Sequence, residues 1–205
     1  MTNNKLKPID FNSVFDFEEA VAEFFGAKYA IAVDSCTHGL ELCLRYFKVK
    51  SFDCPKQTYI SVPFLANKLG IEVIWNDEQW QDYYRLTATI IDAAVLWKKD
   101  SYIPGTCMCL SFQFQKHLSL GRGGMILCDD LYTALELKRM SYDGRLPGIP
   151  WREQDIDTFG YHYYMTPETA KLGLEKLPEA IATEPKKWVV NDWPDLTQMK
   201  IFKTL

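Results

Sequence analysis

Residues 107–128 read CMCLSFQFQKHLSLGRGGMILC, and this stretch decides the fold. Two short apolar runs, 107–112 and 124–128, flank a polar loop and a glycine-rich turn, a pattern that predicts two paired buried strands. Lys116 stands in the loop just after the first run. A lysine at the end of a buried strand loses hydration, which lowers the pKa of its amine and makes it a nucleophile toward a carbonyl. The alternative is an ordinary surface lysine.

The composition is that of a soluble globular protein with one large domain. The chain has 205 residues, of which 47% are hydrophobic and 24% charged, and this length can bury a sizeable core. The net charge of −4 leaves no electrostatic footprint for nucleic acid. No apolar run reaches the length of a membrane span, and the N-terminal segment lacks the apolar core of a signal peptide. We therefore expect a cytoplasmic protein without a nucleic-acid or membrane partner.

The cysteines and histidines indicate neither a disulfide framework nor a metal site. Most of the six cysteines lie in apolar strand or helix patterns, as reduced core thiols do. Cys107 and Cys109 share one face of a strand, but without two further ligands they are interpreted as core packing. The three histidines show no metal-ligand spacing with one another.

Apolar strands alternate with amphipathic helices along the chain. This alternation predicts an α/β domain of three layers, with helices covering both faces of a mostly parallel, mixed sheet. Residues 76–86 are expected to form a short connection, and 144–160 a loop. Further strands are expected at 29–33, 51–54, 71–75 and 88–91, and helices at 16–25, 37–47, 59–68, 131–140 and 167–177.

Polar residues follow three of these strands and are expected to meet at one edge of the sheet. In such sheets, ligands bind beyond the carboxyl ends of the strands. Ser35, Cys36 and Thr37 begin a helix whose N–H groups and hydroxyls suit a phosphate, although a simple N-cap is the alternative. Asp92 closes a buried strand and needs either a cationic partner or a capping role. Ser111 lies five residues before Lys116.

These groups together match what pyridoxal phosphate (PLP) requires. Its aldehyde needs a lysine, its ring nitrogen needs a carboxylate, and its phosphate needs an anion cradle. Tyr59, at the start of a helix, is a candidate to stack on the ring, with an ordinary core aromatic as the alternative.

Five stretches, in order, give the chain a specific resemblance to a known family. It resembles the sugar aminotransferases of the DegT/DnrJ/EryC1/StrS family, PLP enzymes with the aspartate aminotransferase fold (fold type I). The likeness covers roughly residues 15 to 177. The stretches are FEEAVAEFFGAKYAIAVDSCTHGLELCL, TYISVPFLANKLGIEVIWND, TIIDAAVLW, CLSFQFQKHLSLGRGGMILCDD and GYHYYMTPETAKLGLEKL.

The resemblance implies a role for each candidate residue. Lys116 would form the Schiff base with the cofactor, and Asp92 would pair with the ring nitrogen. Tyr59 would stack on the ring. The family also implies a homodimer, in which residues 160–166 reach across to the partner. The phosphate would be held by Ser35, Cys36 through its backbone, Thr37 and Ser111, with His162 contributing from the partner subunit.

The chain also departs from the family pattern. Cys36 stands where the family usually has glycine, Val95 where a glutamine or histidine is common, and His162 where an asparagine reaches the partner's phosphate. Family members are much longer. We therefore expect residues 1–177 to form a PLP-binding large domain and 178–205 to be a tail, the remnant of the C-terminal small domain.

Two functions are compatible with this pattern. The first is a PLP-dependent aminotransferase that moves an amino group from an amino acid to a nucleotide-linked keto-sugar. The second is a degenerate, non-catalytic dimeric homologue that binds PLP or an acidic metabolite without turnover. The shortened chain and the altered residues Val95 and His162 motivate the second hypothesis.

Overall fold

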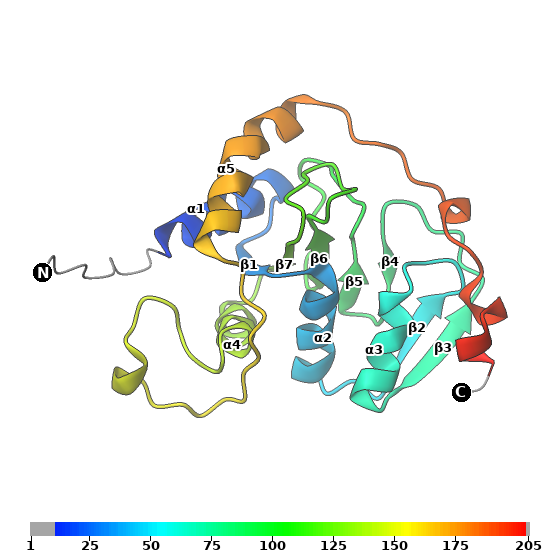
Figure 1. The fold of residues 1–205 in the computed structure, drawn as a ribbon, viewed down its shortest axis with the longest axis horizontal. Helices are drawn as coiled ribbons and strands as arrows, with labels where there is room; N and C mark the ends of the chain where they lie inside the picture. The colour runs from blue at the N-terminus through cyan, green and yellow to red at the C-terminus, as the bar shows by residue number, and fades with distance from the viewer. Residues whose placement is uncertain (1–10, 204–205) are drawn as a thin grey trace, which may run out of the picture.

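The computed structural model describes residues 11–203, which form helices on both faces of a five-stranded sheet (Figure 1). Strands β1, β5 and β6 run in one direction, and β7 and β4 run in the opposite one. The predicted α/β fold with a mixed sheet is thus confirmed, but the expectation that the sheet is mostly parallel is wrong, because β5 and β6 are the one parallel pair in the described part of this sheet. In spatial order the strands are β1 (Tyr29–Val33), β7 (Gly124–Cys128), β6 (Cys107–Ser111), β5 (Ile90–Asp92) and β4 (Tyr84–Arg85).

A second, two-stranded parallel sheet continues the structure beyond β4. It consists of β2 (Ser51–Pro55) and β3 (Glu72–Asn76). The Asp53 N–H donates to the Leu86 carbonyl at 2.9 Å, which ties this sheet to the chain just after β4. Helix α3 (Ser61–Leu69) joins the two strands and packs against both.

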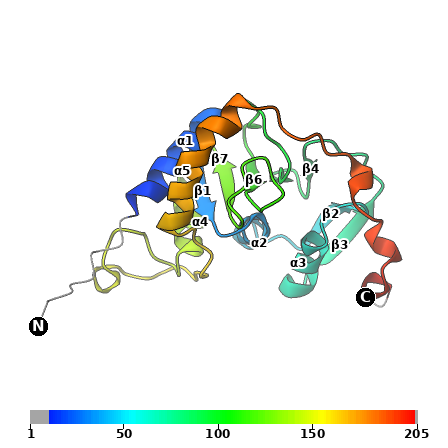
Figure 2. The same ribbon diagram turned by 45° about the horizontal axis from the view of Figure 1, so that its top comes forward.

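The main sheet is covered by two helices on each face. Helices α1 (Asn12–Phe25) and α5 (Pro167–Ala182) pack on one face, and α2 (Cys36–Tyr46) and α4 (Leu131–Ser141) on the other (Figures 1 and 2). Each layer buries its own apolar cluster against the sheet. Because strand side chains alternate between the faces, one strand supplies both clusters: Cys109 packs toward α2, and Met108 packs toward α1.

The helix ends follow the local sequence. Gly26 ends α1 in the left-handed conformation, with φ of 75°, which costs glycine nothing. Asp130 accepts a hydrogen bond from the Thr133 N–H at 2.7 Å and caps α4. Thr166 caps α5 in the same way at 3.3 Å, with Pro167 at the first helical position. The residue types at these ends therefore account for where the three helices start or stop.

Several predicted boundaries are wrong. Helix α1 begins at Asn12 rather than at residue 16. Helix α5 does not end near Leu177 but continues through Pro178 to Ala182. Packing of its apolar side, including Leu177 and Ala180, outweighs the one hydrogen bond that the proline removes. The expected connection 76–86 contains strand β4, which pairs antiparallel with β5.

After α5 the chain crosses the molecule to the far side of the second sheet. Figures 1 and 2 both show this segment running from the end of α5 to α3 and β3. It contains three short 3-10 turns, at Val190–Asp192, Leu196–Gln198 and Lys200–Phe202. A further turn of this kind, Trp151–Glu153, lies in the loop expected at 144–160.

The six cysteines are all buried and free, as expected of core thiols. No helix among residues 11–203 combines the length and apolarity needed to cross a membrane.

Candidate active site

The three polar strand ends meet as the sequence pattern predicts. Strands β1, β5 and β6 point the same way, so their carboxyl ends lie at one edge of the sheet, beside the start of α2. A cavity of about 190 Å³ opens there. Seven of the eight predicted site residues line it: Ser35, Cys36, Thr37, Tyr59, Asp92, Ser111 and Lys116.

Backbone hydrogen bonds hold the lysine loop in a tight shape. The Phe112 N–H donates to the Gly123 carbonyl at 2.9 Å, and the Phe114 N–H donates to the Gly121 carbonyl at 3.1 Å. The Lys116 N–H closes a turn onto the Gln113 carbonyl at 2.8 Å. The glycine turn therefore shapes the loop that presents Lys116 to the cavity.

The Lys116 amine is half-buried beside an acidic group. Burial lowers the pKa of Lys116, and the negative charge of Asp92 opposes this effect. The net shift is downward, so a larger fraction of this amine is unprotonated at neutral pH than for an exposed lysine. The unprotonated amine is the form that attacks a carbonyl.

Asp92 is a buried carboxyl group with a well-defined hydrogen-bond shell. The Tyr84 hydroxyl donates to Oδ2 at 2.6 Å, and the Ala94 N–H donates to Oδ1 at 2.9 Å. Burial raises the pKa of Asp92, and these hydrogen bonds partly offset the rise. Because a buried carboxylate is costly without a positive partner, the position favours a cationic ring nitrogen.

The start of α2 forms the other end of the cavity. Ser35 is the N-cap and accepts a hydrogen bond from the His38 N–H at 3.2 Å. The first N–H groups of a helix carry partial positive charge and bind anions. A Cβ atom at Gly124 would lie 2.5 Å from the Cys36 nitrogen, so glycine at this position lets the start of α2 lie directly on β7.

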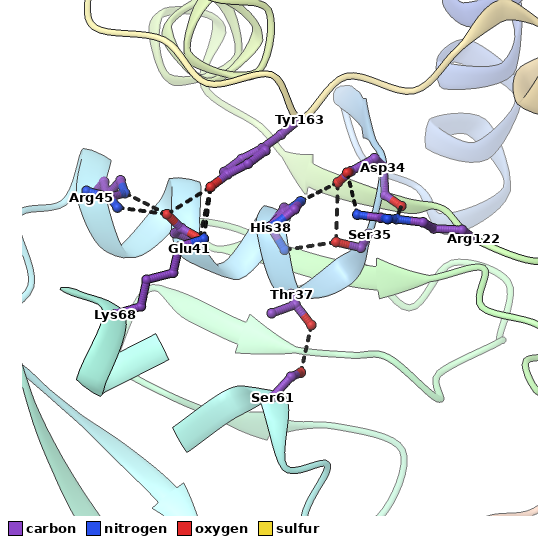
Figure 3. Close-up of polar contacts among 10 residues, drawn as sticks. All are labelled: Asp34, Ser35, Thr37, His38, Glu41, Arg45, Ser61, Lys68, Arg122 and Tyr163. Atoms are coloured by element: carbon purple, nitrogen blue, oxygen red, sulfur yellow. Dashed lines mark hydrogen bonds and ion pairs between the residues drawn. The ribbon is translucent and has the colours of Figure 1, made fainter. Parts of the chain in front are cut away.

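Asp34 organises the turn that leads into α2 (Figure 3). Its Oδ1 lies 2.6 Å from His38 Nδ1, and its Oδ2 accepts from Arg122 Nη2 at 2.7 Å. Arg122 itself lines the cavity. This ion pair therefore connects the glycine turn of the lysine loop with the start of α2.

Deeper along α2, the buried carboxylate of Glu41 joins three elements (Figure 3). It pairs with Arg45 of the same helix at 2.8 Å and with Lys68 of α3 at 2.7 Å. The Tyr163 hydroxyl lies 3.3 Å from Glu41 Oε1. Such a network holds α2 against its neighbours and so maintains the position of its N-terminus.

Three further predicted residues complete the walls. Thr37 Oγ1 lies 2.7 Å from the Ser61 hydroxyl of α3, and Ser111 Oγ accepts from the Gln113 N–H at 3.4 Å. Tyr59 precedes α3 and is 57% exposed. Because Tyr59 lines the cavity and is not buried in the core, its ring is available for stacking.

His162 lies apart from the other predicted residues. Its side chain is 72% exposed and pairs with Asp143 at 3.1 Å. It contributes to a neighbouring hollow together with Arg122, and not to the cavity around Lys116. The predicted contact with a partner subunit's phosphate stays a prediction.

Four residues that the sequence did not predict as site residues also belong to the site. Tyr84 of β4 holds Asp92, and Thr58 in turn lies 2.7 Å from the Tyr84 hydroxyl. Trp188 and Trp193 of the C-terminal segment line the cavity. Two tryptophans stand close together in this segment, and they could have indicated that it packs against the rest of the protein. Large aromatic side chains seldom stay in solvent without a partner.

The assembled groups fit PLP. One cavity brings together an amine of lowered pKa, a buried carboxyl group and a helix N-terminus. These are the groups required by an aldehyde, a ring nitrogen and a phosphate, respectively. Within residues 11–203, no group of three or more histidine, cysteine or acidic side chains is placed to hold a metal ion.

Solved structures similar to this one include PLP-dependent aminotransferases of fold type I. One is PseC of Helicobacter pylori, an aminotransferase involved in the biosynthesis of pseudoaminic acid. It superposes with a TM-score of 0.74 at 13% identity, over 94% of this chain and 80% of that one. A DegT DnrJ EryC1 StrS aminotransferase from Brucella abortus superposes with a TM-score of 0.69 at 19% identity, over 85% of this chain and 59% of that one.

The chain belongs to the DegT/DnrJ/EryC1/StrS aminotransferase family. The family model matches residues 7–104 and 101–187. An uncharacterized protein of Methanocaldococcus jannaschii, MJ1066, is 25% identical over 80% of this chain and 56% of its own length. The chain thus spans a little over half of that curated relative.

Proposed function

We propose that this chain is a PLP-dependent aminotransferase that moves an amino group from an amino acid to a nucleotide-linked keto-sugar. The observation that carries the proposal is the shared cavity of Lys116, Asp92 and the N-terminus of α2. Family membership supports amino transfer. The chemistry of the site and the family together favour this function over a non-catalytic homologue.

Each residue of the cavity has a defined task in this proposal. When bound, PLP supplies an aldehyde that condenses with amines and a ring that accepts electrons. Lys116 Nζ would attach the cofactor and, once released, would move a proton from the substrate carbon to the carbon of the former aldehyde, the transfer that amino exchange requires. Asp92 places negative charge beside the ring nitrogen and keeps a proton there. Tyr59 packs on the ring face.

The start of α2 forms the phosphate end of the site in this proposal. The first N–H groups of α2 would bind the phosphate oxygens, and the hydroxyls of Ser35, Thr37 and Ser111 would orient them. In a homodimer, His162 of one subunit would donate a further hydrogen bond at its partner's site.

The test is a titration of the purified protein with PLP, followed by its visible absorbance. We expect a new visible band that Lys116→Ala abolishes and that Lys98→Ala, a change at an exposed lysine of the same molecule, leaves intact. Amino acids added one at a time should then convert the band and release a keto acid. Absence of any spectral response to PLP contradicts the proposal. A normal band that no amino donor converts would instead support the non-catalytic homologue.

A further inference from the structure

The segment of residues 183–203, here called the cover, is fastened to the molecule beyond the cavity. The Leu196 N–H donates to the Lys56 carbonyl at 2.8 Å, and Gln57 Nε2 donates to the Trp193 carbonyl at 3.1 Å. Leu196 is 1% exposed. The last turn of the cover is fixed as well, because the Phe202 ring lies 5.5 Å from Phe64 of α3.

The other end of the cover is held by α5. The Ala180 carbonyl accepts from Trp97 Nε1 at 2.8 Å, and it lies 2.8 Å from Nε2 of His117, the neighbour of Lys116. With both ends fastened, residues 184–189 must bridge the space between α5 and the second sheet (Figure 2).

Within residues 184–189, the Trp188 side chain turns inward over Lys116. The Lys116 ammonium lies 4.8 Å from the centre of the Trp188 ring, and the Lys186 ammonium lies 3.9 Å from it. The indole of Trp193 lies 5.0 Å from Trp80 and 5.2 Å from Trp188. A chain of tilted ring contacts therefore joins the core to the residue above Lys116.

From this arrangement we infer that Trp188 is a positioning residue that excludes water from the Lys116 amine. This inference deepens the proposed function and rests on it for the use made of the amine. The cavity of about 190 Å³ is smaller than the roughly 300–1,000 Å³ common for ligand sites. The indole therefore occupies space above the lysine.

Two opposing effects of the indole decide the expected result. Contact with an aromatic face stabilises an ammonium group, whereas exclusion of water disfavours it. Burial is the larger influence on Lys116, and Lys186 adds to it as a like charge, while Asp92 and Cys36 act in the opposite direction. Removal of the indole should therefore raise the pKa of Lys116.

The experiment measures the free amine in protein that contains no PLP. Each variant is briefly labelled with acetic anhydride from about pH 6 to 11, and mass spectrometry follows the peptide that contains Lys116, with N-acetyl-lysine as the external standard. In Trp188→Ala the midpoint of labelling should move to higher pH. The labelling rate at neutral pH should fall about 3- to 10-fold, since one pKa unit changes the free amine tenfold.

Matched variants separate water exclusion from other effects. Trp188→Phe retains a ring and should keep the midpoint of the native protein. Lys186→Met removes the like charge but leaves the indole, so the midpoint should rise by less than in Trp188→Ala. An unchanged midpoint in Trp188→Ala, or the same rise in Trp188→Phe, overturns the inference. Because no PLP is present, the result is independent of whether the proposed function holds.

Discussion

At the scale of single residues, Asp92 carries an electrostatic conflict that a cofactor would resolve. Its carboxyl group is 5% exposed, and burial raises its pKa. Tyr84 and Ala94 offset only part of that rise. A positively charged ring nitrogen would compensate the charge directly, since opposite charges in a buried site favour each other's ionised forms.

This conflict predicts a pH dependence of stability. The pKa of Asp92 is higher in the folded than in the unfolded protein, so the folded state binds the proton more tightly. The contribution of Asp92 to stability should be greatest below the unfolded pKa of about 3.9 and should be lost as pH rises through the raised folded pKa. The loss is about 1.4 kcal/mol for each pH unit that separates the two pKa values.

Asp92→Asn should lack this component. Urea unfolding of both proteins without PLP, over a pH series, checks the prediction, and curves that stay parallel contradict it.

The site residues that could be predicted share one property. Lys116, Asp92 and Ser35 each stand where an apolar run ends, so local patterning locates them. Tyr84 could not be found in this way, because its role depends on β4 pairing with β5. The same is true of Trp188, whose partner Lys116 is distant in the sequence.

At the scale of elements, the contact between α2 and β7 sets the geometry of the phosphate end. Gly124 lies at the first position of β7, opposite Val33 of β1. The backbone of Ser35 and Cys36 passes directly over it. Any side chain here pushes against backbone, which cannot rotate away.

Gly124→Ala should therefore displace the start of α2. Forcing an extra methyl group into a packed site costs about 1–3 kcal/mol, and we expect weaker binding of PLP as well. Gly39→Ala is the matched control on α2, because its Cβ would meet the Ile126 side chain at 3.2 Å rather than backbone. Urea unfolding and PLP titration measure both effects. Equal PLP affinity in Gly124→Ala and the native protein would refute the assignment of this cradle.

Most elements could be predicted because hydrophobic periodicity and caps act locally. The exceptions are instructive. Strand β4 has two residues, too few for any period to be visible. Helix α5 continues past Pro178 because its last turns pack against the sheet-covering layer, an energy that the local sequence does not display.

At the scale of the whole molecule, the proposed homodimer makes a distinctive prediction. If each site combines Lys116 of one subunit with His162 of its partner, then Lys116→Ala and His162→Ala impair every site of their own homodimers. A mixed dimer of the two variants regains one complete site. Mixing should thus restore up to about a quarter of native activity, since random pairing yields half mixed dimers with one good site each.

Amino-transfer assays before and after mixing through mild denaturation provide the measurement, with sedimentation to establish that dimers form. A mixture no more active than the sum of its parts contradicts the shared site. The role of His162 stays a prediction, because a contact with a second subunit cannot be predicted from the local pattern of one chain.

The cover has a consequence for the order in which the protein is assembled. The hydrogen bond from Gln57 to Trp193 spans 136 positions of sequence, and contacts of such long range form late in folding. Residues 35–116 also leave the ribosome before residues 183–203 are made. During synthesis the residues of the cavity floor are therefore present before those of its roof, so a cofactor would meet a more open site on the growing chain than on the finished protein.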